Sequence, residues 1–245
     1  MTSSNNSRVA TALAVSVGVF IVAIVLPKFI LSSPAPKIMT TQGLELLLAL
    51  AAIAVLGKGK FADYGFRLPK IDPSAPGRKV RYGLSVLVAL FLGIVATIAM
   101  LALDGNGNPV VRQLSIPQIM LFVWVSSSVI EEILTRGFLQ SHLSALSGKY
   151  VKPFGLRIEL PVLISALFFA CMHLILPFVG ADATTTVVTF LFTLSIGFLA
   201  GHLRAKTGSL LPAIGAHMLA NIGGMIGGII YNVVSFIITG KLPTA

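Results

Sequence analysis

Long apolar stretches alternate with short polar segments along the whole chain. The apolar stretches consist mostly of Ala, Val, Ile, Leu and Phe, and the segments between them hold most of the charged residues. A helix needs about 20 residues to cross the hydrocarbon core of a bilayer, so each stretch predicts at least one transmembrane helix. The predicted spans are residues 9–32, 40–57, 82–103, 116–140, 160–179, 184–203 and 209–239.

The last stretch is long enough for one crossing and a second, short or tilted one. Its "GGMIGG" (223–228) is the natural place for a break, so we expect seven or eight helices. The first stretch is not expected to be a cleavable signal peptide, because "MTSSNNSR" is weakly basic and no clear cleavage site follows. The predicted fold is therefore all-α, a polytopic membrane helix bundle that forms a single domain over residues 1–245.

Composition supports the membrane assignment. The chain is 56% hydrophobic and 11% charged, with a mean hydropathy of +0.94, whereas soluble domains are about 25% charged. The net charge of +10 does not indicate a nucleic-acid partner, because the basic residues lie in short loops and no basic segment is rich in aromatic residues. The one cysteine, Cys171, excludes an internal disulfide.

The distribution of basic residues predicts the orientation. The segment 58–81 holds seven of the eighteen Lys and Arg residues, and the loops at 147–157 and 204–208 hold three and two more. The loops at 104–112 and 180–184 hold one and none. Because cytoplasmic loops are enriched in Lys and Arg, we expect the first three segments in the cytoplasm of a prokaryotic cell and the bundle in its cytoplasmic membrane.

Three charged residues lie inside the fourth span. A charge at the centre of a membrane helix costs about 2.5–3.5 kcal/mol on insertion scales, so these residues are not expected to face lipid. Glu132 and Arg136 are at i and i+4 and can pair, whereas Glu131 has Thr135 at that spacing. We interpret the first two as a structural ion pair and Glu131 as an available general base. A buried cluster of all three charges is the alternative. Glu45, in the second span, is interpreted as an interfacial carboxylate.

Three further candidate site residues fall inside later spans: His173, His217 and Asn221. His142 and His202 lie near helix ends and are assigned to the interface. Glu131 and His217 lie nine and eight residues from their cytoplasmic ends, about 13 and 12 Å at 1.5 Å per residue. We therefore expect one polar cavity, open to the cytoplasm, that these side chains share.

The residue types in this cavity suit amide hydrolysis. A carboxylate such as Glu131 can take a proton from water, and His173 can help to hold that water. His217 and Asn221, one helical turn apart, can donate hydrogen bonds to the oxyanion of a tetrahedral intermediate. This chemistry requires no cofactor, no metal and no acyl-enzyme.

At these residues the chain resembles the CPBP intramembrane proteases, the CAAX-prenyl-protease and bacteriocin-processing group also called Abi. "EEILTR" (131–136) fits EExxxR, "FACMH" (169–173) fits FxxxH, and "HMLAN" (217–221) fits HxxxN. The resemblance covers a core at about 115–225, and "ADYGFRL" (62–68) looks like a segment common upstream in the family. It implies an eight-helix fold around a conical cavity open to the cytoplasm.

Carried over to this chain, the resemblance implies a glutamate-dependent endopeptidase. Glu131 then corresponds to the general base, His173 to its partner, and His217 with Asn221 to the oxyanion-binding pair, while Glu132 and Arg136 have a supporting role. The expected partner is a protein or peptide substrate, with or without a lipid at its C-terminus, that enters from the membrane or the cytoplasm.

Other functions remain open at this point. A metalloprotease could bind zinc with the two histidines and a Glu, although no HExxH string occurs. Serine chemistry of the rhomboid kind lacks its GxSG motif, and "SSS" (126–128) is interpreted as helix-packing residues. A transporter, or a membrane scaffold or immunity protein with a degenerate site, is the non-enzymatic alternative. The sequence indicates neither the substrate nor the oligomeric state.

Overall fold

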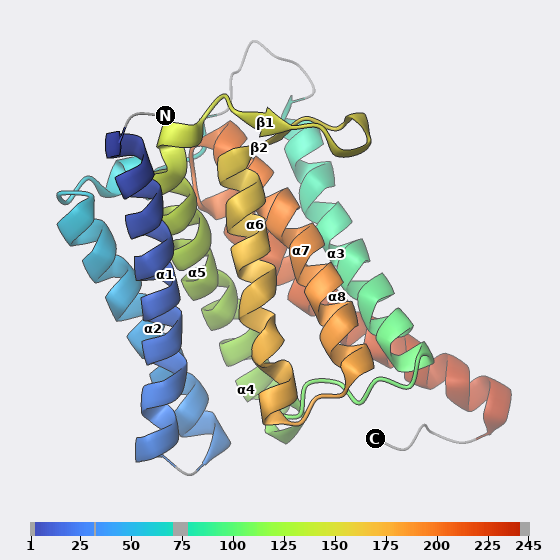
Figure 1. The fold of residues 1–245 in the computed structure, drawn as a ribbon. Coiled ribbons are helices and arrows are strands. Elements are labelled where there is room, and N and C mark those ends of the chain that lie inside the picture. Colours follow the sequence, from blue (N-terminus) through green and yellow to red (C-terminus); the bar gives the residue numbers. More distant parts are fainter. Residues whose placement is uncertain (1–2, 32, 71–77, 241–245) are drawn as a thin grey trace.

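The computed structural model describes residues 3–31, 33–70 and 78–240, which form a bundle of long helices (Figure 1). Within these residues, seven helices are long and apolar enough to cross a membrane, and they lie where the sequence predicts spans. The all-α polytopic bundle is therefore confirmed. The spans are α1 (Ser3–Ile30), α2 (Pro34–Leu56), α3 (Arg78–Ala102), a composite span at 116–140, a fifth span that begins with α6 (Leu160–Met172), α7 (Ala183–Thr207) and α8 (Leu211–Thr239).

Two spans are not uniform α-helices. The fourth contains α4 (Ile116–Gln118) and α5 (Ser128–Glu132), with wider π-helical turns at Ile119–Ser127 and Ile133–Gln140. The fifth changes from α6 to a tighter 3-10 helix at His173–Val179. Departures of this kind are frequent at functional sites, and both adjoin the polar motif residues.

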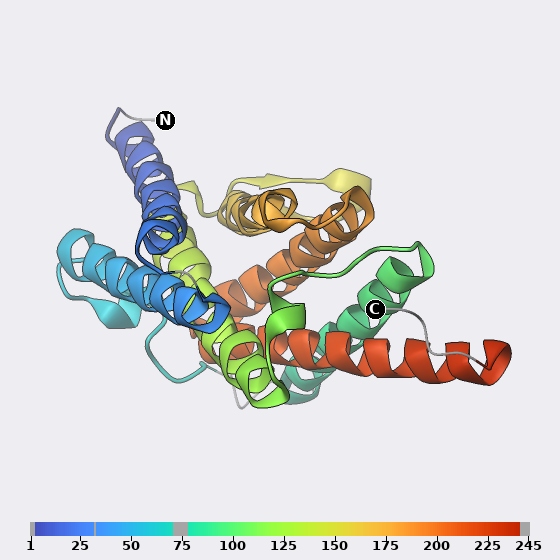
Figure 2. The same ribbon diagram turned by 90° about the horizontal axis from the view of Figure 1, so that it is seen from below.

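The predicted break at "GGMIGG" does not exist, because α8 continues through it to Thr239. Its glycines allow α8 to pack closely along α3, and the two helices lie side by side in Figures 1 and 2. A Cβ on Gly223 would collide with the carbonyl oxygen of Leu90, and one on Gly227 would lie 2.6 Å from that of Ile94. Small residues permit such backbone contact between membrane helices. The described chain therefore has seven spans, one fewer than the resemblance implies.

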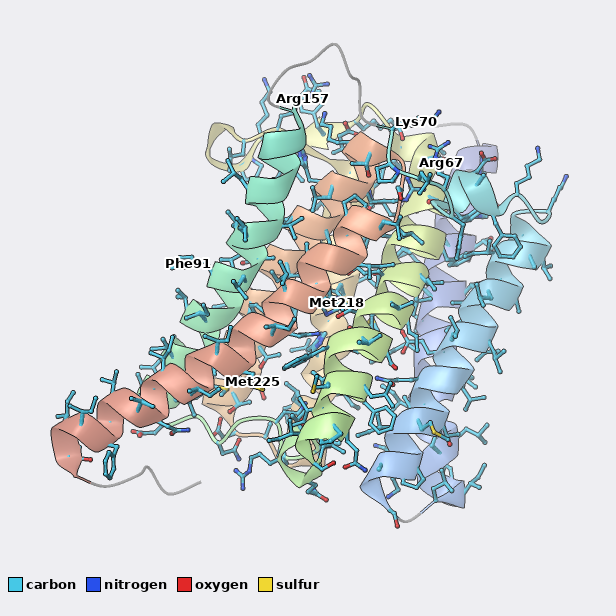
Figure 3. The ribbon with its side chains drawn as sticks, turned by 180° about the vertical axis from the view of Figure 1, so that it is seen from behind. Arg67, Lys70, Phe91, Arg157, Met218 and Met225 are labelled. Carbon is cyan, nitrogen blue, oxygen red and sulfur yellow. The ribbon has the colours of Figure 1, made fainter. Side chains whose placement is uncertain are left out.

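The two ends of the bundle differ in charge. The end formed by residues 58–70, 141–159 and 204–210, called the basic end here, carries Arg67, Lys70 and Arg157 (Figure 3). At the opposite end, called the far end, the described basic residues are Lys28, Lys37 and Arg112. The helix directions thus reproduce the charge asymmetry that the sequence predicts.

The basic end is closed by the segment after α2. This segment forms a 3-10 turn at Phe61–Tyr64, and Gly65 follows it with φ +95°, a backbone conformation that favours glycine. The Tyr64 hydroxyl lies 3.1 Å from His142 Nδ1, and the His142 ring stacks on Phe138 with centroids 5.4 Å apart. His142 is therefore buried within the basic end, and burial lowers its pKa from the usual 6.5. A short hairpin, β1 (Tyr150–Val151) and β2 (Ile158–Glu159), lies at the same end.

Candidate active site

The four residues selected as a catalytic set line one cavity of about 290 Å³. Glu131 comes from α5, His173 from the end of α6, and His217 and Asn221 from α8. The folding of three separate spans thus brings together the polar side chains that the sequence places at membrane depth.

Glu131 and His217 face each other across a short gap. Glu131 Oε2 lies 3.9 Å from His217 Nε2, and the two side chains are 20% and 7% exposed. This distance is too long for a direct hydrogen bond. One water molecule can bridge two polar atoms at such a separation, so the pair can hold a water against the carboxylate.

His217 is oriented from behind by the predicted ion pair. Arg136 Nη1 donates to Glu132 Oε1 at 2.9 Å, and His217 Nδ1 lies 3.2 Å from the same oxygen. Because a carboxylate only accepts, Nδ1 carries a proton and Nε2 is the nitrogen left for Glu131. Glu132 and Arg136 are both 0% exposed, and Arg136 also donates to the Gly197 carbonyl at 3.0 Å. The pair therefore fixes the tautomer of His217.

His173 is held by its own helix. Its Nδ1 lies 2.9 Å from the carbonyl oxygen of Phe169, so Nδ1–H is the donor and Nε2 has a free lone pair. The Phe169 ring stands edge-on to both histidines, with centroids 5.1 Å from His173 and 5.2 Å from His217. The Phe of the FxxxH motif thus separates the two imidazoles with its ring, and its carbonyl oxygen is the hydrogen-bond acceptor for His173.

Asn221 has contacts that differ from those expected of an oxyanion donor. Its Nδ2 donates to the Val123 carbonyl at 2.8 Å and to the Ser128 hydroxyl at 3.2 Å. Both amide hydrogens are therefore used inside the protein, and only Oδ1 remains. In this arrangement Asn221 connects α8 to the fourth span by hydrogen bonds, and Ser128, from the "SSS" string, accepts one of them.

Sequence reasoning missed Gln42 and misplaced Glu45, both on α2. Gln42 lines the cavity beside Glu131 and donates through Nε2 to the Phe122 carbonyl at 2.8 Å. Glu45 is central in α2 and only 6% exposed, so its interpretation as interfacial is wrong. The available signal was the pair of polar residues at i and i+3 in an otherwise apolar span.

Glu45 is expected to lower the free energy of unfolding while it contributes to peptide cleavage. Its Oε1 is buried without a hydrogen-bond partner among the described residues, and the side chain lines a cavity together with Glu131. An unsatisfied buried polar group costs about 1–3 kcal/mol, so Glu45→Leu is expected to raise the melting temperature while reducing peptide cleavage. Unfolding and cleavage measured on one preparation test this, and a lower melting temperature would contradict it.

A second cavity of about 720 Å³ shares Gln42, Glu131 and His173 with the first. Its lining includes Lys28 and Lys37, and both cavities reach Asn108 and Val110 in the far-end loop. The lining of both cavities therefore extends to the far end, whereas the sequence predicts an opening beside the basic loops.

The reason for this opening lies in helix direction and in the closed basic end. Side chains on a helix lean toward its N-terminus, and the helix that carries Glu131 begins at the far end. Residue counts from the basic end therefore did not indicate the direction in which the Glu131 side chain leans. The segment that contains Tyr64 and Gly65 blocks the other side: Gly65 O accepts from the Leu210 N–H at 3.0 Å.

Comparison with known families agrees with this site. Residues 113–223 match the family model of type II CAAX prenyl endopeptidases, Rce1-like. No curated protein and no solved structure matches the chain. The matched region contains all three motifs, whereas Gln42 and Glu45 on α2 lie outside it. This core is therefore similar to the CAAX-type intramembrane proteases of the CPBP family, and the seven apolar helices indicate a multi-pass membrane protein.

Proposed function

We propose that the protein is a glutamate-dependent intramembrane endopeptidase in which Glu131 activates water. The observation that carries the proposal is the 3.9 Å gap between Glu131 and His217, with His217 oriented by the buried pair of Glu132 and Arg136. A water in this gap contacts both a base and a nitrogen fixed in one tautomer. Such preorganisation is what general-base catalysis requires.

The proposed reaction has two steps. Glu131 takes one proton from the water while the water oxygen adds to the carbonyl carbon of the scissile bond, which forms a tetrahedral oxyanion. Glu131 then returns the proton to the amide nitrogen as the C–N bond breaks, which releases an amine and a new carboxyl group. His173 Nε2 can accept from the same water, and no covalent enzyme intermediate forms.

The oxyanion needs hydrogen-bond donors in this cavity. His217 donates from Nε2 only when both of its ring nitrogens carry protons, with Nδ1–H directed at Glu132. Gln42 has a second amide hydrogen in addition to the one bound by Phe122. We assign the oxyanion to these two donors, in place of the pair of His217 and Asn221 that the resemblance implies.

The substrate that fits best is a polypeptide end with an attached apolar chain. The larger cavity adjoins Glu131, and much of its lining is apolar: Phe20, Ile24, Ile38, Met172, Ile175, Leu176, Phe178 and Val179. A lipid chain buried there would gain about 0.8 kcal/mol per methylene. The family description, a CAAX prenyl endopeptidase, names substrates of this kind.

Matched peptides test the substrate assignment. Purified protein in detergent is incubated with a C-terminal peptide that carries a farnesylated cysteine and with the same peptide unmodified. We expect a KM at least about tenfold lower for the farnesylated peptide, because burial of a few methylenes suffices for this. Equal KM values would limit the proposal to an endopeptidase for unmodified segments.

Two alternatives remain testable in the same assay. Zinc chemistry predicts loss of cleavage with a strong chelator and recovery with zinc, although within the described residues no three His, Cys, Asp or Glu side chains are grouped as metal ligands. A scaffold or transporter predicts no cleavage of any peptide. A normal phenotype of cells that express Glu131→Gln would favour the scaffold or the transporter.

The orientation of the site needs a separate proposal. The charge rule places the basic end in the cytoplasm, whereas the cavity opens at the far end. The two expectations from the sequence, cytoplasmic basic loops and a cytoplasmic cavity, therefore cannot both hold. We retain the charge rule and propose that substrates reach Glu131 from the opposite face of the membrane.

Cysteine accessibility decides the orientation. In a Cys171→Ser background, Gln113→Cys marks the far end and Ser144→Cys the basic end, and both positions are exposed. We expect a membrane-impermeant maleimide to label Gln113→Cys in intact cells and Ser144→Cys only after permeabilisation. The reverse pattern would place the cavity mouth in the cytoplasm.

A further inference from the structure

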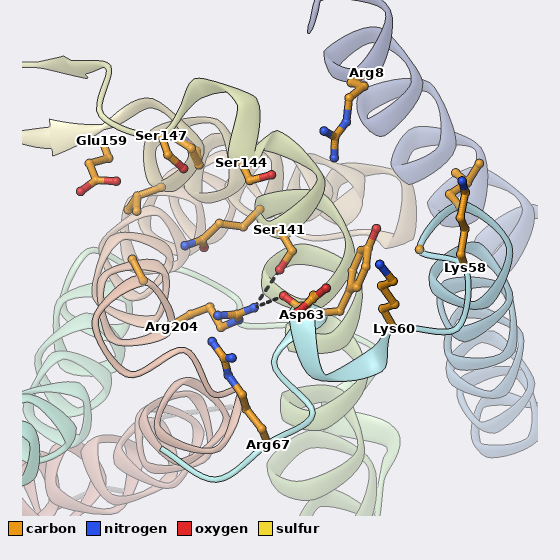
Figure 4. Close-up of a pocket in the computed structure, with 17 residues that line it drawn as sticks. Arg8, Lys58, Lys60, Asp63, Arg67, Ser141, Ser144, Ser147, Glu159 and Arg204 are labelled. Atoms are coloured by element: carbon orange, nitrogen blue, oxygen red, sulfur yellow. Dashed lines mark hydrogen bonds between the residues drawn. The ribbon is translucent and has the colours of Figure 1, made fainter. Parts of the chain in front are cut away.

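A separate pocket of about 540 Å³ lies at the basic end, and none of its lining residues belongs to the catalytic cavity (Figure 4). Segments far apart in the chain contribute to it: the start of α1, the segment after α2, the turn after the fourth span and the end of α7. Five of its lining residues are cations: Arg8, Lys58, Lys60, Arg67 and Arg204.

Arg204 is the buried member of this group. It is 8% exposed, and its Nη2 donates to the Asp63 carbonyl at 3.0 Å and to the Ser141 hydroxyl at 2.9 Å (Figure 4). Its Nε is buried and has no hydrogen-bond partner among the described residues. A buried guanidinium is costly to remove from water, and an anion in the pocket would offset its positive charge.

The pocket has an excess of positive charge. Only two carboxylates, Asp63 and Glu159, line it together with the five cations, and within the described residues neither forms a salt bridge to them. Arg67 is held in place by a 2.7 Å bond from its Nε to the Gly208 carbonyl. In Figure 4 the Arg67 and Arg204 side chains approach each other. Two positive charges so placed repel each other, and an anion between them would remove that repulsion.

Hydroxyl groups complete the donor set. Ser141, Ser144 and Ser147 recur every three residues along the pocket wall. Guanidinium, ammonium and hydroxyl donors from several directions suit the tetrahedral array of oxygens in a phosphate group. A planar carboxylate would use only a fork of two donors.

We propose that this pocket binds a phosphate group, supplied either by the headgroup of an anionic phospholipid or by a free phosphate. Basic pockets at the cytoplasmic ends of membrane helices recognise lipid headgroups in this way. The site is independent of the catalytic proposal, because it lies at the opposite end of the bundle and its occupancy is measured without cleavage.

Ligand-dependent thermal unfolding of the full chain tests the proposal. In one arm, detergent-solubilised protein is titrated with inorganic phosphate against chloride at constant ionic strength. In the other, bilayer discs of phosphatidylglycerol in phosphatidylcholine are compared with phosphatidylcholine alone. The variants are Arg67→Gln and the exposed Lys60→Gln, which keeps the test valid if the first fails to fold. Lys206→Gln is the control, because it removes one exposed cation at the same end outside the pocket.

We expect a saturable rise in melting temperature in at least one arm. Saturation with inorganic phosphate identifies a free anion as sufficient, and saturation with phosphatidylglycerol alone identifies the lipid. The midpoint should move about tenfold in Arg67→Gln, the loss expected for one charge-assisted hydrogen bond, and less than about twofold in Lys206→Gln, as for a screened surface charge. No saturation in either arm, or equal shifts in the pocket variants and the control, would overturn the proposal.

Discussion

Glu131→Gln is expected to lower kcat for peptide cleavage by about 10²–10⁴-fold, the contribution typical of a general base. The amide has nearly the shape of the carboxylate but cannot accept the proton of the attacking water. KM should change little, because Glu131 faces the 3.9 Å gap and is not part of the ion pair that orients His217. Progress curves with saturating substrate measure the two constants separately.

Glu159→Gln is the matched control for this change. It removes the same charge from β2 at the basic end, where Glu159 lines the phosphate pocket and not the catalytic cavity. Its kcat should remain within about twofold of the parent, as for most surface substitutions. A similar loss in both variants would indicate a general effect on the fold and would remove support for the base.

Arg136→Gln is expected to destabilise the protein by about 3–5 kcal/mol, the cost of leaving one partner of a buried ion pair uncompensated. Arg136 and Glu132 are both fully buried, and the guanidinium also lies 4.6 Å from the centre of the Phe169 ring. Cleavage should fall as well, since Glu132 without its partner no longer holds His217 in the same state. Unfolding in detergent and cleavage below the transition separate these effects.

The double variant Glu132→Leu with Arg136→Met sharpens this prediction. Replacement of a buried ion pair by apolar residues of similar volume is often neutral or stabilising, so stability should recover. Activity should not recover, because His217 Nδ1 then lacks the carboxylate that it contacts at 3.2 Å. Recovery of both would show that the pair has no role in orienting His217.

Much of the bundle could be predicted from the sequence, because transmembrane helices need an apolar length that is visible in the chain. The three motifs also predicted which residues would meet, and the i,i+4 spacing predicted the pairing of Glu132 with Arg136. These features depend on local spacing and on the cost of placing polar groups in lipid.

What could not be predicted depends on contacts between distant segments. Whether "GGMIGG" breaks a helix or packs it depends on α3, where Leu90 lies against Gly223. The sequence does not show that the side-chain amide of Asn221 donates to the Val123 carbonyl, because the two residues lie on different spans. The far-end opening follows from the segment around Tyr64, which closes the other end. None of these neighbours is indicated by the motif itself.

The central claim, a metal-free water activated by Glu131, is tested most directly by one comparison. Cleavage by the purified parent protein is measured before and after treatment with a strong chelator, with Glu131→Gln in the same buffer. The account predicts full activity of the chelated parent and background activity of Glu131→Gln. Loss on chelation that zinc restores, or full activity of Glu131→Gln, would contradict it.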